Sequence, residues 1–152
     1  MKLATLCYLL KDDKVLMVYR NKKENDYHKG KWNGLGGKFE SGESPFDCAI
    51  REVQEESGLT MINPALKGFI TFPKFDGFFD WHVFLFTSTE FTGELTESPE
   101  GKLEWIKIED LNKLNLWEGD KIFIDWIFNK KFFCAKFIYE NGKYLRHEVN
   151  FQ

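Results

Sequence analysis

Most of the chain consists of short segments in which apolar residues alternate with polar ones or form brief runs, a pattern typical of β-strands. Two hairpins are expected, one around the charged turn Lys11–Lys14 and one around Asn141-Gly142, a strong turn signal. The predicted strands cover residues 3–10, 15–19, 65–75, 81–87, 103–108, 131–139 and 143–151.

Two other segments have the spacing of amphipathic helices. The first is expected to begin after Ser44, an N-cap residue followed by Pro45, and to end before Gly58. The second covers residues 118–129. Strands combined with two helices predict an α+β fold, with helices packed on the faces of a mixed sheet, in a single domain of residues 1–152.

Composition narrows the class of protein. With 152 residues, 43% of them hydrophobic, and a net charge of −3, the chain is neither disordered nor a basic nucleic-acid binder. Its first apolar run is too short to span a membrane. The three cysteines lack metal-ligand spacing, so we expect them to be small core residues in a reducing, cytoplasmic protein. Aromatic residues make up 17% of the chain, more than a core of this size requires, so some rings are expected to face a ligand.

A charged loop and a glycine-rich segment lie between the second strand and the first helix. Residues 21–31 are too polar for the core and form a loop long enough to have a function. In Trp32–Lys38, three glycines permit unusual backbone angles and close approach of a ligand.

The first helix carries Glu52, Glu55 and Glu56 at positions i, i+3 and i+4. Such carboxylates repel one another by a few tenths of a kcal/mol per pair, and a divalent cation would remove that penalty. Hard oxygen ligands favour Mg²⁺ or Mn²⁺. The alternative is a solvated acidic face.

The spacing of these residues matches every defined position of the Nudix box. The matching residues are Gly37, Glu43, Arg51, Glu52, Val53, Glu55, Glu56, Gly58 and Leu59. The chain therefore resembles the Nudix (MutT-type) hydrolases. This resemblance implies an α/β/α sandwich around a mixed sheet and hydrolysis of a nucleoside diphosphate linked to another moiety.

The resemblance also assigns roles at the metal end of the site. It implies that the Gly36 carbonyl, Glu52, Glu55 and Glu56 hold the metal, with Glu100 as an additional ligand. Arg51 would orient the glutamates and Glu43 would fix the loop, although a purely structural salt bridge between these two is an alternative. For Glu100 the alternative is an exposed loop acid. The general base is left open among Glu52, Glu55 and Glu100.

Three segments narrow the resemblance to the branch that hydrolyses oxidised purine nucleoside triphosphates such as 8-oxo-dGTP. They are Trp32–Lys38, Gln54–Thr60 and Leu116–Asp120. In that branch an Asn, here Asn33, bonds the purine, and a Trp, here Trp117, stacks on it. Further candidate substrate contacts are Asp120 for the base edge, Phe72 and Trp81 for the pocket wall, and Lys23 and Lys38 for the phosphates.

Several alternatives accompany this assignment. Trp117 could be a core ring, and the lysines could be solvated. Of the rings Phe72, Phe75, Phe78, Phe79 and Trp81, most are expected to be core. Where the branch carries two adjacent acids, this chain has Gly119-Asp120, which puts the base selectivity in question.

The expected partner is a nucleoside triphosphate, with Mg²⁺ or Mn²⁺ as cofactor. The absence of a basic stripe argues against long nucleic acid. We expect no membrane association, and a monomer or weak dimer. The alternative functions are another Nudix substrate, such as a canonical dNTP, a pterin triphosphate or an RNA cap, and a non-catalytic nucleotide-binding domain.

Overall fold

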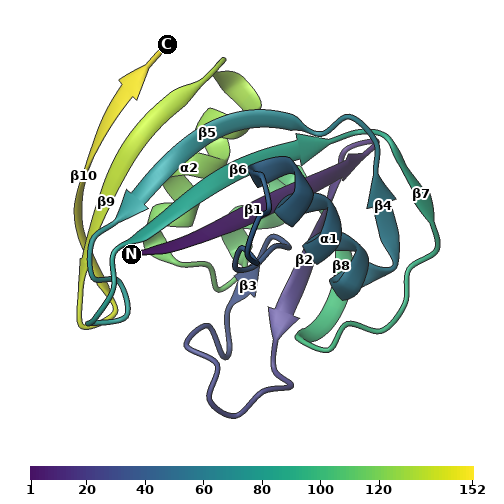
Figure 1. The fold of residues 1–152 in the computed structure, drawn as a ribbon, viewed down its shortest axis with the longest axis horizontal. Helices are drawn as coiled ribbons and strands as arrows, with labels where there is room; N and C mark the ends of the chain where they lie inside the picture. Colours follow the sequence, from purple (N-terminus) through teal and green to yellow (C-terminus); the bar gives the residue numbers. More distant parts are fainter.

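The computed structural model describes all 152 residues and contains an eight-stranded mixed sheet with one helix on each face (Figure 1). The predicted α+β sandwich is therefore confirmed. The strands are β1 (Lys2–Lys11), β2 (Lys14–Arg20), β3 (Trp32–Asn33), β4 (Leu59–Met61), β5 (Ala65–Phe72), β6 (Trp81–Ser88), β7 (Phe91–Gly93), β8 (Gly101–Lys107), β9 (Phe133–Glu140) and β10 (Lys143–Phe151). The helices are α1 (Pro45–Ser57), the 3₁₀ helix η1 (Ile108–Lys113) and α2 (Glu118–Asn129).

The sheet has the strand order β10-β9-β5-β6-β1-β2-β3, and β8 also pairs with β2. The β1–β6 and β5–β9 pairs are parallel, and all the others are antiparallel. Next to their turn, β1 and β2 pair only at Leu10–Val15 and Lys11–Lys14. Further along β1, the glycine-rich segment takes the place of β2 through the bridges Cys7–Leu35 and Ala4–Lys38. This pairing holds the glycine-rich segment against the centre of the sheet.

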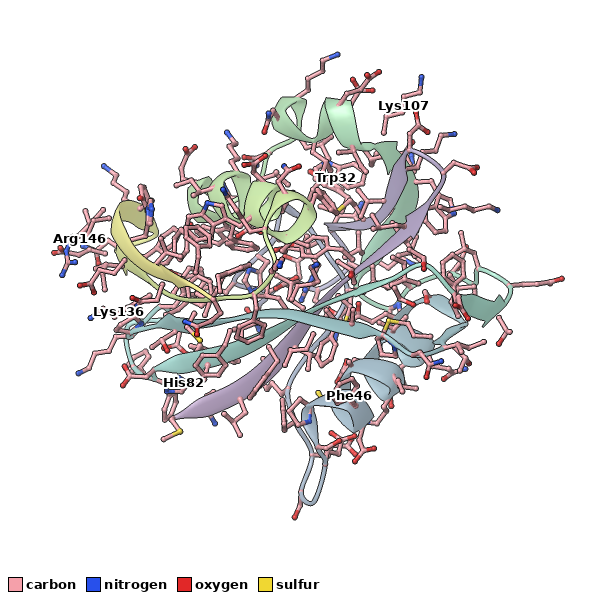
Figure 2. The ribbon with its side chains drawn as sticks, turned by 90° about the horizontal axis from the view of Figure 1, so that it is seen from above. Trp32, Phe46, His82, Lys107, Lys136 and Arg146 are labelled. Carbon is pink, nitrogen blue, oxygen red and sulfur yellow. The ribbon has the colours of Figure 1, made fainter.

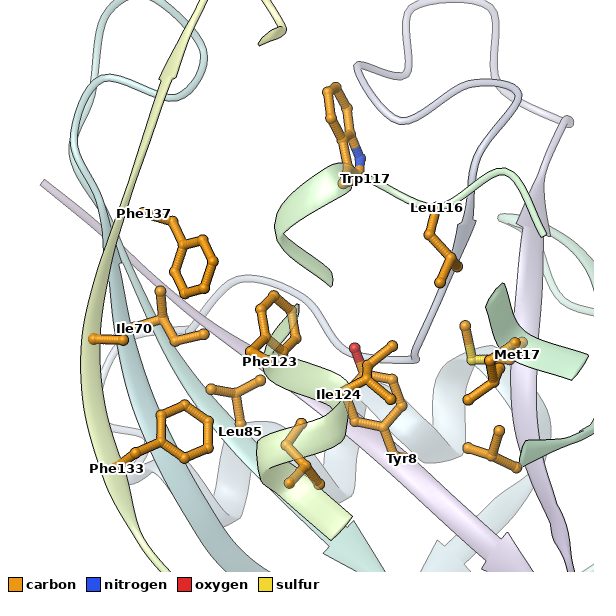
Figure 3. Packing of buried hydrophobic residues seen from close by; sticks show 14 of the residues in the cluster. Tyr8, Met17, Ile70, Leu85, Leu116, Trp117, Phe123, Ile124, Phe133 and Phe137 are labelled. Carbon is orange, nitrogen blue, oxygen red and sulfur yellow. The ribbon is translucent and has the colours of Figure 1, made fainter. Parts of the chain in front are cut away.

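The two faces of the sheet carry separate hydrophobic clusters, because successive side chains of a strand point to opposite faces. Tyr8 of β1 packs with Phe123 of α2, whereas its neighbours Cys7 and Leu9 pack with Val53 of α1. Figure 2 shows the helices on opposite sides of the sheet. Figure 3 shows Phe123 and Ile124 of α2 packed against side chains of the sheet. The labelled side chains of the sheet in this contact are Tyr8, Ile70, Leu85, Phe133 and Phe137.

Helix α1 begins and ends at the predicted residues. The Ser44 hydroxyl accepts from the backbone N–H of Asp47 at 3.1 Å, and the Asp47 carboxylate accepts from the N–H of Ser44 at 3.0 Å. This reciprocal capping box fixes the first turn. At the other end Gly58 adopts a left-handed φ of 81°, which favours glycine.

Some expectations were wrong in detail. Strand β5 ends at Phe72 rather than at residue 75, because Pro73 has no N–H to pair and Lys74 has a left-handed φ of 44°. The turn that follows leaves Phe78 and Phe79 exposed instead of in the core. Cys134 is also exposed, since it points away from the core on β9. Neither helix is long and apolar enough to span a membrane.

Candidate active site

A cavity of about 840 Å³ joins the glycine-rich segment and α1 to the start of α2. Its wall also includes parts of the 21–31 loop and of the 73–80 loop. The predicted site residues that line it are Lys23, Asn33, Gly36, Lys38, Glu52, Glu56, Phe72, Trp81, Glu100, Trp117 and Asp120. The predicted residues that do not line it are Glu43, Arg51 and Glu55.

Two glycines allow the carboxylate end of the cavity to form. Gly36 has a φ of 142°, and a Cβ at this position would lie 2.1 Å from the Thr5 carbonyl oxygen. A Cβ on Gly37 would lie 2.5 Å from the carboxyl carbon of Glu52. A side chain at Gly36 would collide with the backbone of β1, and one at Gly37 would displace the Glu52 carboxylate, so the two glycines let the loop approach both β1 and the glutamates of α1 closely.

The three glutamates of α1 have different surroundings. Glu56 is buried, Glu52 retains 17% of its side-chain exposure, and Glu55 is 54% exposed. Glu52 and Glu56 line the cavity, whereas Glu55 does not, although it shares the Arg51 Nη1 donor with Glu52. The metal-binding and catalytic roles predicted for Glu55 have less geometric support than those of its two neighbours.

Arg51 links the loop before α1 to the glutamates. Its guanidinium donates to both carboxylate oxygens of Glu43, at 2.6 and 2.9 Å, to Glu52 at 2.8 Å and to Glu55 at 3.2 Å. It also donates to the carbonyl oxygen of Lys38 at 2.9 Å. Hydrogen bonds from Arg51, followed by the backbone N–H of Glu40, lower the pKa of Glu43 to about 2. Arg51 thus holds one oxygen of Glu52 in a fixed position.

Few hydrogen bonds stabilise the charged form of the Glu56 carboxylate. It accepts one long hydrogen bond, at 3.4 Å from the N–H of Gly36. Burial and the neighbouring Glu52 raise the pKa of Glu56 to about 8, with Arg20 opposing and Glu100 adding to the shift. The Gly36 carbonyl accepts no hydrogen bond from the protein.

The chemistry of this donor set fits a hard divalent cation, because it combines carboxylates with a free carbonyl oxygen, although no three acidic side chains are gathered closely enough to hold an ion as they stand. Glu52, Glu56, Glu100 and the Gly36 carbonyl would hold the ion. A bound Mg²⁺ would supply charge neutralisation for phosphate oxygens and lower the pKa of a water molecule.

Glu100 reaches the cavity from the segment before β8. Its carboxylate pairs with Arg20 at 3.0 Å and with Lys23 at 2.8 Å, and its side chain is 16% exposed. It is therefore not a free loop acid. Lys23 contacts Glu100 in this structure, and Lys38 lies over the Trp81 ring, with Nζ 5.7 Å from the centroid.

Trp117 dominates the other end of the cavity. It belongs to the larger hydrophobic cluster and is 9% exposed, yet it also forms part of the cavity wall. Tyr27 stacks parallel to the indole at 5.7 Å between centroids, and the edges of Phe75 and Tyr139 contact it. The indole N–H donates to His28 Nδ1 at 2.8 Å.

Two polar side chains lie buried beside this aromatic group. Asp120 is 6% exposed, and no protein group donates to its carboxylate. Burial raises its pKa to about 7, against a lowering contribution from Lys31. Asn33 is 6% exposed, and its Nδ2 has no hydrogen-bond partner. Buried groups of this kind require partners, and a ligand edge in the cavity can supply them.

Tyr139 contacts the residue before Asp120. Its hydroxyl accepts from the Gly119 N–H at 2.6 Å. A Cβ on Gly119 would lie 2.8 Å from this hydroxyl and 2.9 Å from Phe137. In this chain a tyrosine therefore occupies the space that a second acid would need.

Several cavity residues were not predicted from the sequence. They are Arg20, Asp26, Tyr27, His28, Phe75 and Tyr139. The length and charge of the 21–31 loop indicated a function, but no periodicity shows which of its side chains point inward.

The fold is a mixed sheet between two helices, and its cavity is lined by acidic residues of α1 and by aromatic rings. The NUDIX domain model matches residues 1–127. The chain belongs to the Nudix family, whose hydrolases generally use divalent metals such as Mg²⁺.

Named relatives agree with this assignment. The chain is 41% identical over 128 residues to the uncharacterized Nudix hydrolase YvcI of Bacillus subtilis, a match covering 82% of this chain and 77% of the relative. It is 33% identical to the oxidized purine nucleoside triphosphate hydrolase of Mus musculus, covering 92% and 88% respectively. The crystal structure of a MutT protein from Bacillus halodurans superposes with a TM-score of 0.89 at 32% identity, covering 99% and 98%. These matches support a Nudix hydrolase of the MutT type.

Proposed function

We propose that residues 1–152 form one catalytic domain that hydrolyses oxidised purine nucleoside triphosphates, such as 8-oxo-dGTP, to the monophosphate and pyrophosphate. One observation carries the proposal: a single cavity contains both the carboxylates of α1 and the aromatic group around Trp117. A nucleotide in this cavity would place its triphosphate at the carboxylates and its base against the aromatic group.

At the carboxylate end, Glu52, Glu56, Glu100 and the Gly36 carbonyl hold Mg²⁺ or Mn²⁺. Arg51 keeps Glu52 oriented through its 2.8 Å bond. Because Glu55 lies outside the cavity, Glu52 and Glu100 are the better candidates for taking the proton from the attacking water.

At the aromatic end, the base lies against Trp117, and Asn33 and Asp120 bond its edge. Phe72 and Trp81 form the adjoining wall, and Lys23 and Lys38, which line the same cavity, contact the phosphates. The relative in Mus musculus named an oxidized purine nucleoside triphosphate hydrolase supports an oxidised purine as the base. The free thiols of Cys7, Cys48 and Cys134 support a reducing compartment such as the cytoplasm.

The test is a panel of substrates with Mg²⁺, with products separated by chromatography. The panel contains 8-oxo-dGTP, dGTP, the other canonical dNTPs, a nucleotide sugar and a dinucleotide. We expect the highest kcat/KM on 8-oxo-dGTP, with the monophosphate and pyrophosphate as products. Equal or faster turnover of the other compounds would overturn the substrate assignment, and no turnover of any of them would overturn the catalytic assignment.

A further inference from the structure

His28 lies on the cavity wall and is held from three sides. Its backbone N–H donates to Asp26 Oδ1 at 3.0 Å, and its Nδ1 accepts from the Trp117 indole at 2.8 Å. Its ring stacks on Phe75, with centroids 6.0 Å apart and planes inclined by 20°. The imidazole therefore has a fixed orientation, as expected of a group that positions a ligand.

The bond to Trp117 determines where the imidazole proton lies. An indole N–H can only donate, so Nδ1 of His28 must carry a lone pair. The proton of the neutral ring is consequently on Nε2. Burial and the nearby Arg20 lower the pKa of His28 to about 4, against Asp26 and Glu100, so the ring is neutral at pH 7.

The Nε2–H group has no partner within the protein, whereas the other polar groups of His28 are engaged. His28 also lies between the two ends of the cavity. On one side its ring contacts Trp117 and Phe75, and on the other its backbone bonds Asp26, which pairs with Arg20 and through it with Glu100. A nucleotide spanning the cavity would pass this donor with its nucleoside part.

We propose that His28 is a specificity-determining residue that donates one hydrogen bond from Nε2 to an oxygen of the bound nucleoside. This inference rests on the proposed function, since it requires a nucleotide in the cavity. The acceptor is an uncharged oxygen, which belongs either to a sugar hydroxyl or to a base carbonyl. A neutral donor suits either one, and the test separates them.

Two substitutions separate the bond to Trp117 from the bond to the substrate. In His28→Asn, the amide oxygen takes the place of Nδ1 and accepts from Trp117, but no donor remains at the position of Nε2. In His28→Gln, the amide nitrogen reaches the position of Nε2, but the bond to Trp117 is lost. His82→Asn is the matched control, because His82 lies outside the cavity and bonds Thr71 through Nδ1 at 3.1 Å.

We expect His28→Asn to keep the thermal midpoint of the wild type and to lower kcat/KM about 2- to 10-fold, the effect of one uncharged hydrogen bond. His28→Gln should regain part of this loss while unfolding at a lower temperature. Calorimetric titration with the nucleoside monophosphate, without metal, should show the same weakening of binding, which a role confined to folding would not produce.

Substrate analogues identify the acceptor. If it is a sugar hydroxyl, the 3′-deoxy analogue should be turned over equally by the wild type and His28→Asn. If it is a base carbonyl, the wild type and His28→Asn should turn over equally an analogue whose base lacks this carbonyl.

An unchanged kcat/KM in His28→Asn, or an equal loss on every nucleotide and both analogues, would overturn the inference. If the wild type turned over no nucleotide, the proposed function itself would fail, so the two failures are distinguishable.

Discussion

Asp120 gives the stability of this protein a dependence on pH that one substitution should remove. Its carboxylate is 6% exposed and receives no hydrogen bond, so the folded protein favours the protonated form. Replacement by asparagine keeps the shape and cannot ionise. The variant Asp120→Asn therefore isolates the contribution of this one ionisation.

The magnitude follows from the two pKa values. In the unfolded chain the pKa of Asp120 is 3.8, and in the folded protein burial raises it to about 7. Between these values the unfolded chain has released its proton and the folded protein has not, so stability falls as pH rises. At about 1.4 kcal/mol per unit, the loss reaches about 4 kcal/mol and levels off above pH 7.

The assay is urea unfolding followed by tryptophan fluorescence between pH 4.5 and pH 8. The free energy of unfolding of Asp120→Asn minus that of the wild type should grow by about 3 kcal/mol across this range, because about 1 kcal/mol of the loss already falls below pH 4.5. Asp125→Asn is the control, since Asp125 is exposed on the same helix, α2. A difference that stays constant with pH, or that shrinks as pH rises, would refute the reasoning.

Three further changes test other parts of the structure. Glu56→Gln should keep the fold but lower metal-dependent kcat by at least about 100-fold, because it removes a buried carboxylate from the metal site. The control is Glu109→Gln, at an exposed position. Turnover equal to that of the control would exclude Glu56 from the mechanism. Gly37→Ala should lower kcat/KM about 10- to 100-fold with little change in melting temperature, since its Cβ would lie 2.5 Å from the Glu52 carboxyl carbon and displace this carboxylate. Steady-state kinetics equal to those of the wild type would contradict this prediction and show that the loop adapts. Phe123→Ala should lower the free energy of unfolding by about 3–5 kcal/mol in urea titrations, because the ring is fully buried, and a loss below about 1 kcal/mol would mean that the core refills the space.

Local signals in the sequence were sufficient for the two α-helices and the hairpins, but not for η1, which begins at Ile108, a residue expected in a strand. Ser44, Asp47 and Gly58 determine the ends of α1 through contacts within a few residues, and the structure confirms both ends. Helix α2 covers the predicted residues 118–129. Strands β4 and β7, with three residues each, are too short to show alternation, and their pairing depends on residues far apart in the chain.

Local spacing predicts some residues of the candidate site, whereas others depend on contacts between distant parts of the chain. Glu52 and Glu56 were predicted from helical spacing, which also places Glu55 nearby but cannot show that it stays half-exposed and outside the cavity lining. The contact between His28 and Trp117 joins residues 89 positions apart, so no local pattern predicts it. The left-handed Lys74 and the exposed Phe78 likewise depend on how the 73–80 turn, which supplies Phe75 and Asp76 to the cavity wall, is folded.

The contact between Gly119 and Tyr139 has a consequence for how this site can change during evolution. An acid introduced at position 119 would collide with the tyrosine hydroxyl, and loss of the hydroxyl alone would leave the Gly119 N–H without its partner. Either change alone is therefore unfavourable: an acid at position 119 while Tyr139 is present, and loss of the hydroxyl at position 139 while Gly119 is present. We expect the two positions, twenty residues apart, to be exchanged together among relatives, so that a second acid is found with a residue at 139 that lacks the hydroxyl.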